Sequence, residues 1–272
     1  MASRAEQKAA ARAAREARQS ELKLAAARRT RMAMTAGVIG VAVVALVVAI
    51  IVSSSGGHKK NTRLSGGQKA AAVRAVQAEL AGIPQHGNVL GKASAPITLT
   101  EYGDLVCPIC RDFAVTTEPP IISGLVRTGN AKLVFRGFET ASQSANASEY
   151  VATQVAARSA GLQGLEWNYV LLVYHEQPQN LNGQPAETVS YITPAYLQGI
   201  AKQVPHLSPV SWQSHLADQA LANDVTLDGQ AALASGAQGT PAVTVTGPKG
   251  TALDTEAIPT LAGLQALIAQ LS

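Results

Sequence analysis

The two cysteines of this chain constrain its fold more than any other feature, because they stand close together directly behind a predicted strand. Residues 97–102 (ITLTEY) alternate in character and include β-branched residues, which is typical of a strand. A short turn leads to the motif CPIC at residues 107–110, and Pro108 suits the first turn of a helix, where its missing N–H costs nothing. Residues 131–136 (AKLVFR) form a second predicted strand. We therefore expect a strand–helix–strand unit with the cysteines at the start of the helix.

The spacing of the cysteines favours redox chemistry over a metal site or a structural disulfide. A zinc ribbon needs a second cysteine pair, or a histidine pair at ligand spacing. The five histidines are instead scattered along the sequence, at His58, His86, His175, His206 and His215. A disulfide within the motif closes too short a loop to stabilise the fold through chain entropy. We expect no metal and no other cofactor; the alternative to a redox role is two buried, reduced cysteines.

The position of each cysteine on the helix predicts its role. Cys107 is expected at the N-terminus, where unpaired N–H groups and the positive end of the helix dipole favour a thiolate. The thiolate is the attacking species, so Cys107 is the predicted nucleophile that forms a mixed disulfide with substrate. Cys110 falls one turn into the helix and is the predicted resolving thiol.

Residues 32–52 contain no charged side chain and are long enough to span a bilayer as a helix, which needs about 20 residues. A cleaved signal peptide usually has a shorter apolar stretch, although the serines at 53–55 leave cleavage open. A buried core helix is the other alternative. Seven Lys and Arg residues lie in 12–31 and four in 53–72. This excess predicts a single-pass protein of the cell membrane with a cytoplasmic N-terminus and an extracytoplasmic catalytic domain.

The net charge of +4 belongs to the N-terminal tail and not to the rest of the chain. Residues 1–31 carry nine basic and three acidic side chains, which leaves 13 basic and 15 acidic residues for the remainder. A domain of this balance lacks the basic surface that nucleic acids require, so we expect no nucleic-acid partner. Aromatic residues make up only 4% of the chain, so the core is expected to consist of Ala, Val, Leu and Ile.

The remaining sequence divides the chain into segments of different character. We expect a basic cytoplasmic tail (1–31), a transmembrane helix (32–52), a linker with a short helix at 69–80 (53–86), a first α/β part that carries the motif (87–141), a helical insertion (142–235) and a second α/β part (236–272). Smaller features are a loop at 88–96, a helix break at Pro119-Pro120, helices at 144–162, 165–177, 193–204, 208–224 and 226–236, strands at 242–246 and 251–253, and a helix at 258–271. The expected fold class is α/β with one small mixed sheet.

Two stretches of the sequence resemble the DsbA family of thioredoxin-fold proteins. The run APITLTEYGDLVCPIC at residues 95–110 is similar to the strand, acidic loop and active-site motif of that family. The run GTPAV at residues 239–243 is similar to the loop in which the family carries a cis-proline. The family also inserts a helical block at the corresponding place. The resemblance covers about residues 87–271 and implies a thioredoxin-like sheet with a large inserted helical domain, of the membrane-anchored bacterial type.

The resemblance implies roles for individual residues. Pro241 corresponds to the cis-proline beside the disulfide, with an ordinary trans turn proline as the alternative. The Thr240 backbone is then free to pair with an extended substrate, and Pro108 and Ile109 are expected to contact substrate as well. Glu101 matches a buried carboxylate that exchanges protons with Cys110, unless it lies solvated on an edge strand. Asp104 is expected to form the turn before the motif.

The resemblance also implies an activity, a protein thiol–disulfide oxidoreductase outside the cytoplasm. The leading expectation is that the Cys107–Cys110 disulfide passes to reduced, unfolded secreted proteins and is regenerated by a membrane redox partner. A reductase or isomerase of the same fold, kept reduced by such a partner, is the first alternative, and a non-catalytic binding module is the second. The dipeptide between the cysteines is Pro-Ile and not Pro-His, so Cys107 lacks a stabilising imidazole and the pair should be less oxidising.

Overall fold

The computed structural model describes residues 62–141 and 147–272. The basic tail, the apolar run at 32–52 and residues 53–61 of the linker lie outside the described residues. Among the helices of the described residues, none is long and apolar enough to cross a membrane. The transmembrane anchor therefore stays a prediction from the sequence.

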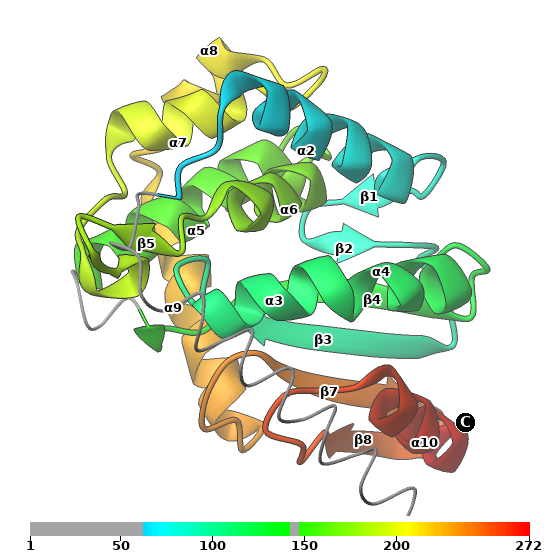
Figure 1. Ribbon diagram of the computed structural model, residues 1–272. Coiled ribbons are helices and arrows are strands. Elements are labelled where there is room, and N and C mark those ends of the chain that lie inside the picture. Colours follow the sequence, from blue (N-terminus) through cyan, green and yellow to red (C-terminus); the bar gives the residue numbers. More distant parts are fainter. Residues whose placement is uncertain (1–61, 142–146) are drawn as a thin grey trace, which may run out of the picture. The chain divides into compact units, whose positions relative to one another are not determined.

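A six-stranded mixed sheet lies at the centre of the described structure (Figure 1). Across the sheet its strands are β1 (Gln85–His86), β2 (Val89–Leu90), β4 (Ala131–Gly137), β3 (Ile97–Gly103), β7 (Ala242–Gly247) and β8 (Gly250–Leu253). β3 runs parallel to β4 and antiparallel to β7, so the strand that leads to the cysteines is central. The predicted mixed sheet is confirmed.

The ends of the helices next to the sheet follow from the prolines and capping residues of the sequence. They are α3 (Pro108–Thr116), α4 (Glu118–Ile121), a π-helical turn (Ile122–Val126) and α10 (Leu261–Leu271). The predicted break is found two residues earlier, at Thr117: α3 ends at Thr116, and Pro119-Pro120 stand in the first turn of α4, where proline is tolerated. α10 starts later than the predicted residue 258, because the Thr260 side chain caps it by accepting a hydrogen bond from the Gly263 N–H.

Helices cover both faces of the central strand. Leu99 packs in the main core, which also holds Leu264 of α10. Tyr102 points to the opposite face and packs in a second cluster with Ala232 of α9 (Gln219–Ala234). Successive side chains of a strand point to opposite faces, so β3 is buried from both sides.

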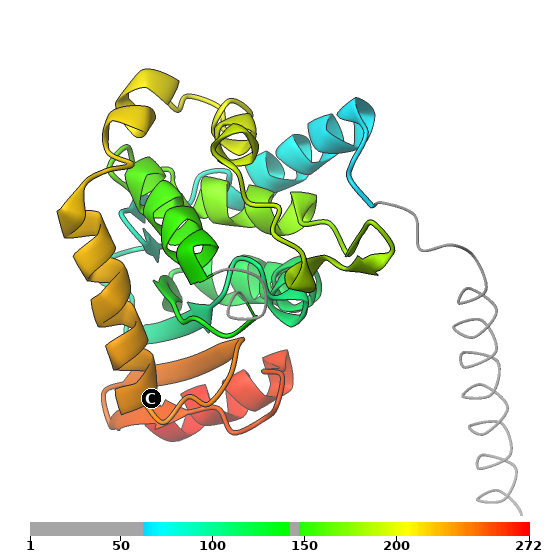
Figure 2. The same cartoon turned by 90° about the vertical axis from the view of Figure 1, so that its left-hand side faces the viewer.

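The inserted block is mainly helical, as predicted, and lies above the sheet in Figure 1, while α9 returns from it alongside the strands (Figure 2). Besides α9 it contains α5 (Ala147–Gly161), α6 (Glu166–Glu176), a hairpin of β5 (Asn180–Leu181) and β6 (Gln184–Pro185), a 3₁₀ turn (Ala186–Thr188), α7 (Pro194–Ala201) and α8 (Pro209–Ser214). One predicted boundary was wrong: the chain breaks before Asp218 and not near Val225. The Asp218 side chain caps α9 by accepting from the Ala220 N–H, whereas Val225 is buried within that helix.

Helix α2 (Gly66–Leu80) begins before the predicted residue 69, because Ser65 and Gln68 form a reciprocal capping box. This helix was predicted as part of the linker, but it packs against α6 and buries Val76 and Leu80 in the main core. It is therefore an integral part of the fold.

The segment predicted as a loop at 88–96 contains the short strand β2, so that prediction was partly wrong. Val89 and Leu90 pair with Val134 and Leu133 of β4. A two-residue strand is too short to give an alternating sequence pattern, and its pairing depends on the neighbouring strand.

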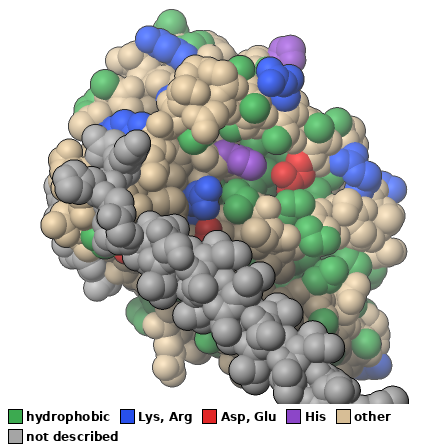
Figure 3. Space-filling view, viewed as in Figure 1, with side chains coloured by type: hydrophobic (Ala, Val, Ile, Leu, Met, Phe, Trp, Pro, Cys, Tyr) green, Lys and Arg blue, Asp and Glu red, His purple; other side chains and the backbone are tan. Residues whose placement is uncertain are grey.

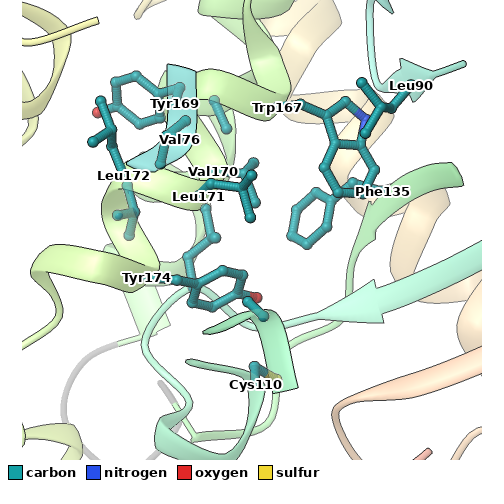
Figure 4. Close-up of a cluster of buried hydrophobic side chains, with 14 of the residues drawn as sticks. Val76, Leu90, Cys110, Phe135, Trp167, Tyr169, Val170, Leu171, Leu172 and Tyr174 are labelled. Carbon is teal, nitrogen blue, oxygen red and sulfur yellow. The ribbon is translucent and has the colours of Figure 1, made fainter. Parts of the chain in front are cut away.

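The core is more aromatic than the composition suggested. Its largest fully buried side chains include Trp167, Trp212, Tyr169, Tyr174 and Phe135. Phe135 meets the rings of Trp167 and Tyr174 edge to face, and all three lie in the cluster shown in Figure 4. The expectation of a purely aliphatic core was therefore wrong, because the few aromatic residues of this chain are concentrated inside it.

Candidate active site

Cys107 is the N-cap of α3, and Pro108 takes the first helical position, as the sequence predicted. The Cys107 Sγ accepts a hydrogen bond from the Cys110 backbone N–H at 3.5 Å. Both cysteines are free thiols; Cys110 is fully buried beneath Tyr174, and 4% of the Cys107 surface is exposed (Figure 4). The start of the helix thus presents its free N–H groups to the Cys107 sulfur.

The electrostatics of the motif separate the two thiols. A hydrogen bond from the Cys110 thiol, with further ones from the backbone and Thr240, lowers the pKa of Cys107 to about 7. Burial raises the pKa of Cys110 well above its usual value, and the hydrogen bond it donates to Cys107 adds to this. The arrangement can hold a thiolate on Cys107 and a protonated thiol on Cys110 near neutral pH.

Asp104 shapes the turn that leads to the motif, as predicted. Its Oδ1 accepts from the Val106 N–H at 3.0 Å, and its backbone carbonyl accepts from the Cys107 N–H at 2.9 Å. Its Oδ2 accepts from the Thr140 N–H at 2.9 Å, which ties the turn to the segment after β4. The carboxylate therefore fixes two loops of the site at once.

Gln177, just past the end of α6, contacts the site although the sequence analysis did not single it out. Its Nε2 donates to the carbonyls of Leu105 at 3.1 Å and Cys107 at 3.2 Å. The residue is buried, with 4% of its surface exposed. A lone glutamine after a predicted helix carries no signal of this contact, which depends on how the insertion packs against the motif.

The loop at residues 239–243, which carries the run GTPAV, lies against Cys107. The Thr240–Pro241 peptide bond is cis, the conformation that the resemblance implied. The Cys107 thiol donates to the Thr240 carbonyl at 3.7 Å, and the Thr240 hydroxyl lies 2.5 Å from that of Thr140. The structure thus brings together three predicted site residues, Cys107, Thr240 and Pro241.

Glu101 lies on the central strand β3 and is buried, with 1% of its surface exposed. The alternative of a solvated position on an edge strand is therefore wrong. Its carboxyl group meets that of Glu118 from α4, which is equally buried. Burial raises the pKa of Glu101 to about 7, and both burial and the Glu101 carboxyl raise that of Glu118 well above its usual range. Two such groups cannot both ionise cheaply, so at least one carries a proton.

The surface around the motif is partly apolar. Ile109 is 45% exposed and Pro108 is half-buried, so both are accessible beside the Cys107 sulfur. On the face shown in Figure 3, the Lys and Arg side chains outside the grey region are scattered and do not gather into one patch. In the part of the chain that the structure describes, no three His, Cys, Asp or Glu side chains come together so as to hold a metal ion.

A family model described as "Thioredoxin" matches residues 85–262, which is more than half of the chain. The chain belongs to the thioredoxin family. Among the relatives of this thioredoxin-family protein, "Probable disulfide bond formation protein D" of Bacillus cereus is 27% identical over 159 residues, 58% of this chain and 69% of that protein.

Solved structures show the same fold. The oxidised form of BdbD from Bacillus subtilis superposes with a TM-score of 0.56 at 21% identity, covering 69% of this chain and 96% of that one. Alpha-DsbA1 of Wolbachia pipientis gives a TM-score of 0.53 at 19% identity, with coverages of 68% and 89%. The predicted thioredoxin-like α/β fold with a helical insertion is confirmed.

Proposed function

We propose that this thioredoxin-family protein forms disulfides in reduced, unfolded secreted proteins by exchange at Cys107 and Cys110. The observation that carries the proposal is the position of Cys107, which caps α3 and faces the Thr240 carbonyl beside the cis-proline. An extended substrate segment beside Thr240 would place its own cysteine next to this sulfur.

The exchange starts from the Cys107–Cys110 disulfide. A substrate thiolate attacks the Cys107 sulfur; a new substrate–Cys107 bond forms, the Cys107–Cys110 bond breaks, and its electron pair leaves on Cys110. A second substrate thiolate then attacks the bound substrate sulfur and releases Cys107 as a thiolate. The substrate loses two electrons and the protein gains them. The hydrogen bonds that lower the pKa of Cys107 stabilise its thiolate, so this sulfur is a good leaving group.

Cys110 needs a proton when it leaves, and we assign this proton to Glu101. Tyr174 supports the assignment, because burial raises the pKa of its hydroxyl and the neighbouring Cys110 and Glu101 groups add to that effect. Glu101 and Cys110 thus both lie near Tyr174, on the same side of the core. A carboxyl group with a pKa of about 7 can both give and take a proton near neutral pH.

We place the exchange outside the cytoplasm, with residues 32–52 as a membrane anchor and a membrane redox partner that reoxidises Cys107 and Cys110. The charge-free run and the seven-to-four asymmetry of basic residues support this orientation. A reductase or isomerase kept reduced by such a partner is the second candidate, because Pro-Ile supplies no imidazole to the thiolate.

The test of the exchange reaction uses the full chain and a reduced, unfolded secreted protein as substrate. Wild-type protein should oxidise the substrate, and Cys107→Ser should abolish the reaction. Cys110→Ser has no internal disulfide to pass on, so it is given the disulfide-bonded form of the substrate. Attack of its Cys107 thiolate on that disulfide should leave a mixed disulfide that is visible on non-reducing gels, because the resolving sulfur is gone. Full activity of the Cys107→Ser variant would refute the proposal.

The test of direction is the reduction potential of the cysteine pair, measured against glutathione. We expect a value above thioredoxin's of about −270 mV and below the value of about −120 mV of the strongest oxidant of this fold. A potential at or below that of thioredoxin, with the protein found reduced in cells, would favour the reductase or isomerase.

A further inference from the structure

A cavity of about 410 Å³ opens beside the cis-proline loop. Residues 236–242 form one wall, and residues 253–257, between β8 and α10, form the other. Thr240 lines this cavity and also presents its carbonyl to the Cys107 thiol at 3.7 Å. Thr240 therefore connects the cavity to the sulfur that forms the mixed disulfide.

The cavity is acidic. Of its twelve lining residues two are charged, Asp254 and Glu256, and no Lys, Arg or His is among them. Asp254 has 7% of its surface exposed. Its Oδ1 accepts from the Glu256 N–H at 2.9 Å, but its buried Oδ2 has no hydrogen-bond partner within the described part of the chain. A buried carboxylate oxygen without a donor is costly, and an incoming cation would remove that cost.

We propose that this cavity receives a Lys or Arg side chain of the substrate segment, and that Asp254 determines this specificity. The inference rests on the proposed exchange reaction and adds to it the class of substrate: segments with a basic side chain close to the cysteine. A guanidinium or ammonium group can supply the hydrogen bond that Oδ2 lacks and pair with its charge. An acidic side chain at the same place would be repelled by both carboxylates.

The position of Asp254 sets the distance between the basic side chain and the substrate cysteine. The Asp254 N–H donates to the Val243 carbonyl at 2.9 Å, so Asp254 lies beside the second residue after Pro241. Two residues of strand span about 7 Å. A basic side chain within about two residues of the cysteine can therefore reach the carboxylate while the cysteine lies at Cys107.

The test measures how fast the oxidised full chain reacts with short peptides of one sequence. Each peptide has a single cysteine, and Lys, Gln or Glu stands one or two residues before or after it. Rates are divided by those of the same peptides with oxidised glutathione, which removes differences in intrinsic thiol reactivity. At one of these positions the Lys peptide should react at least about fivefold faster than the Glu peptide. About 1 M salt should reduce this ratio, because it screens the charges.

The variant Asp254→Asn should lower the Lys-to-Glu ratio clearly below that of the wild type, and the Glu256 carboxylate, which still repels the Glu peptide, accounts for the rest. The amide oxygen of this variant can still accept from the Glu256 N–H, so the loop is preserved. Asp218→Asn is the matched control: Asp218 also accepts from the N–H two residues ahead at 2.9 Å, but it does not line the cavity. This control should keep the ratio of the wild type.

The outcomes separate the two proposals. Equal normalised rates for all peptides, with exchange intact, would overturn the basic-substrate inference and leave the exchange reaction standing. The absence of any exchange would refute the proposed function itself. If Asp254→Asn does not fold, the salt dependence of the wild-type ratio decides: a Lys preference that salt does not reduce would contradict the role of Asp254.

Discussion

Gln177 stands 70 residues from Cys107 in the sequence, yet its amide holds two carbonyls of the turn that carries this cysteine. Within the described part of the chain, the Gln177 amide is the donor to the Leu105 carbonyl, whereas the Cys107 carbonyl also accepts from the Arg111 N–H at 3.1 Å. The amide thus joins the end of α6 to the nucleophile and makes the insertion part of the active site.

Replacing this amide tests the connection. Gln177→Leu should lower the free energy of unfolding by about 1–3 kcal/mol, because the buried Leu105 carbonyl loses its donor. Gln177→Glu should also raise the pKa of Cys107, because it places a negative charge beside the thiolate. Denaturant unfolding and a thiolate absorbance titration measure the two effects. Gln163→Leu, which removes a half-buried amide far from the motif, is the control, and an equal loss there would contradict the prediction.

The buried carboxyl of Glu101 predicts a stability that depends on pH. Burial raises its pKa in the folded protein from 4.5 to about 7. A raised pKa means that the folded state is favoured while the group is protonated, so stability is fully present below about pH 4.5 and falls as pH rises through about 7. Glu101→Gln should remove part of this fall, by on the order of 2 kcal/mol at pH 8. Urea midpoints at several pH values measure it; an unchanged pH profile would contradict the shift.

At the scale of elements, α2 shows how packing can add a helix to a fold. The family model begins at residue 85, beyond the end of this helix. Even so, Ala72, Val76 and Leu80 are buried on one face of α2, and Val76 is only 1% exposed. This face covers α6 and the π-helical turn, so α2 completes the core.

Truncating one of these side chains tests whether α2 unfolds together with the rest. Val76→Ala should lower the free energy of unfolding by about 2 kcal/mol within a single transition, because it removes two buried methyl groups. Val151→Ala, at a position that is 41% exposed, should change it little. A separate early transition, seen by hydrogen exchange confined to α2, would show that the helix is an independent appendage.

At the scale of the whole molecule, a buried ionic network joins the insertion to the sheet. Arg158 of α5 pairs with Glu166 of α6 at 2.9 Å and with Asp228 of α9. The Asp228 carboxylate also accepts from the Gly137 N–H at the end of β4. Three helices of the insertion and strand β4 are therefore joined through Arg158 and Asp228.

Removing this guanidinium should loosen the insertion from the sheet. Arg158→Met leaves two largely buried carboxylates without their partner and should cost about 3–5 kcal/mol. Arg74→Met on the exposed surface of α2 should cost less than about 0.5 kcal/mol. Denaturant unfolding of both variants makes the comparison, and similar losses would contradict a structural role of the network.

The orientation of the chain in a membrane also concerns the whole molecule. Protease treatment of intact spheroplasts should remove the domain that carries the cysteines and spare the N-terminal tail, because the basic excess retains that tail in the cytoplasm. A protected C-terminus would contradict this orientation, and a mature N-terminus near Ser55 would show cleavage in place of an anchor.

The sequence by itself determined the features that depend on neighbouring residues. The strand at 97–102, the motif at the start of α3, the break just before Pro119-Pro120 and the turn at Asp104 each follow from local propensity and capping. These signals suffice because strand alternation, proline geometry and helix capping act within a few residues.

The tertiary structure alone decided the features that join distant segments. It buried Glu101 against Glu118, placed the Gln177 amide on the motif, paired β2 with β4 and set Asp254 beside the cis-proline loop. None of these contacts leaves a periodic pattern, because each depends on burial and on how separate elements pack. The sequence thus predicted where the reactive sulfur lies, and packing decided which groups surround it.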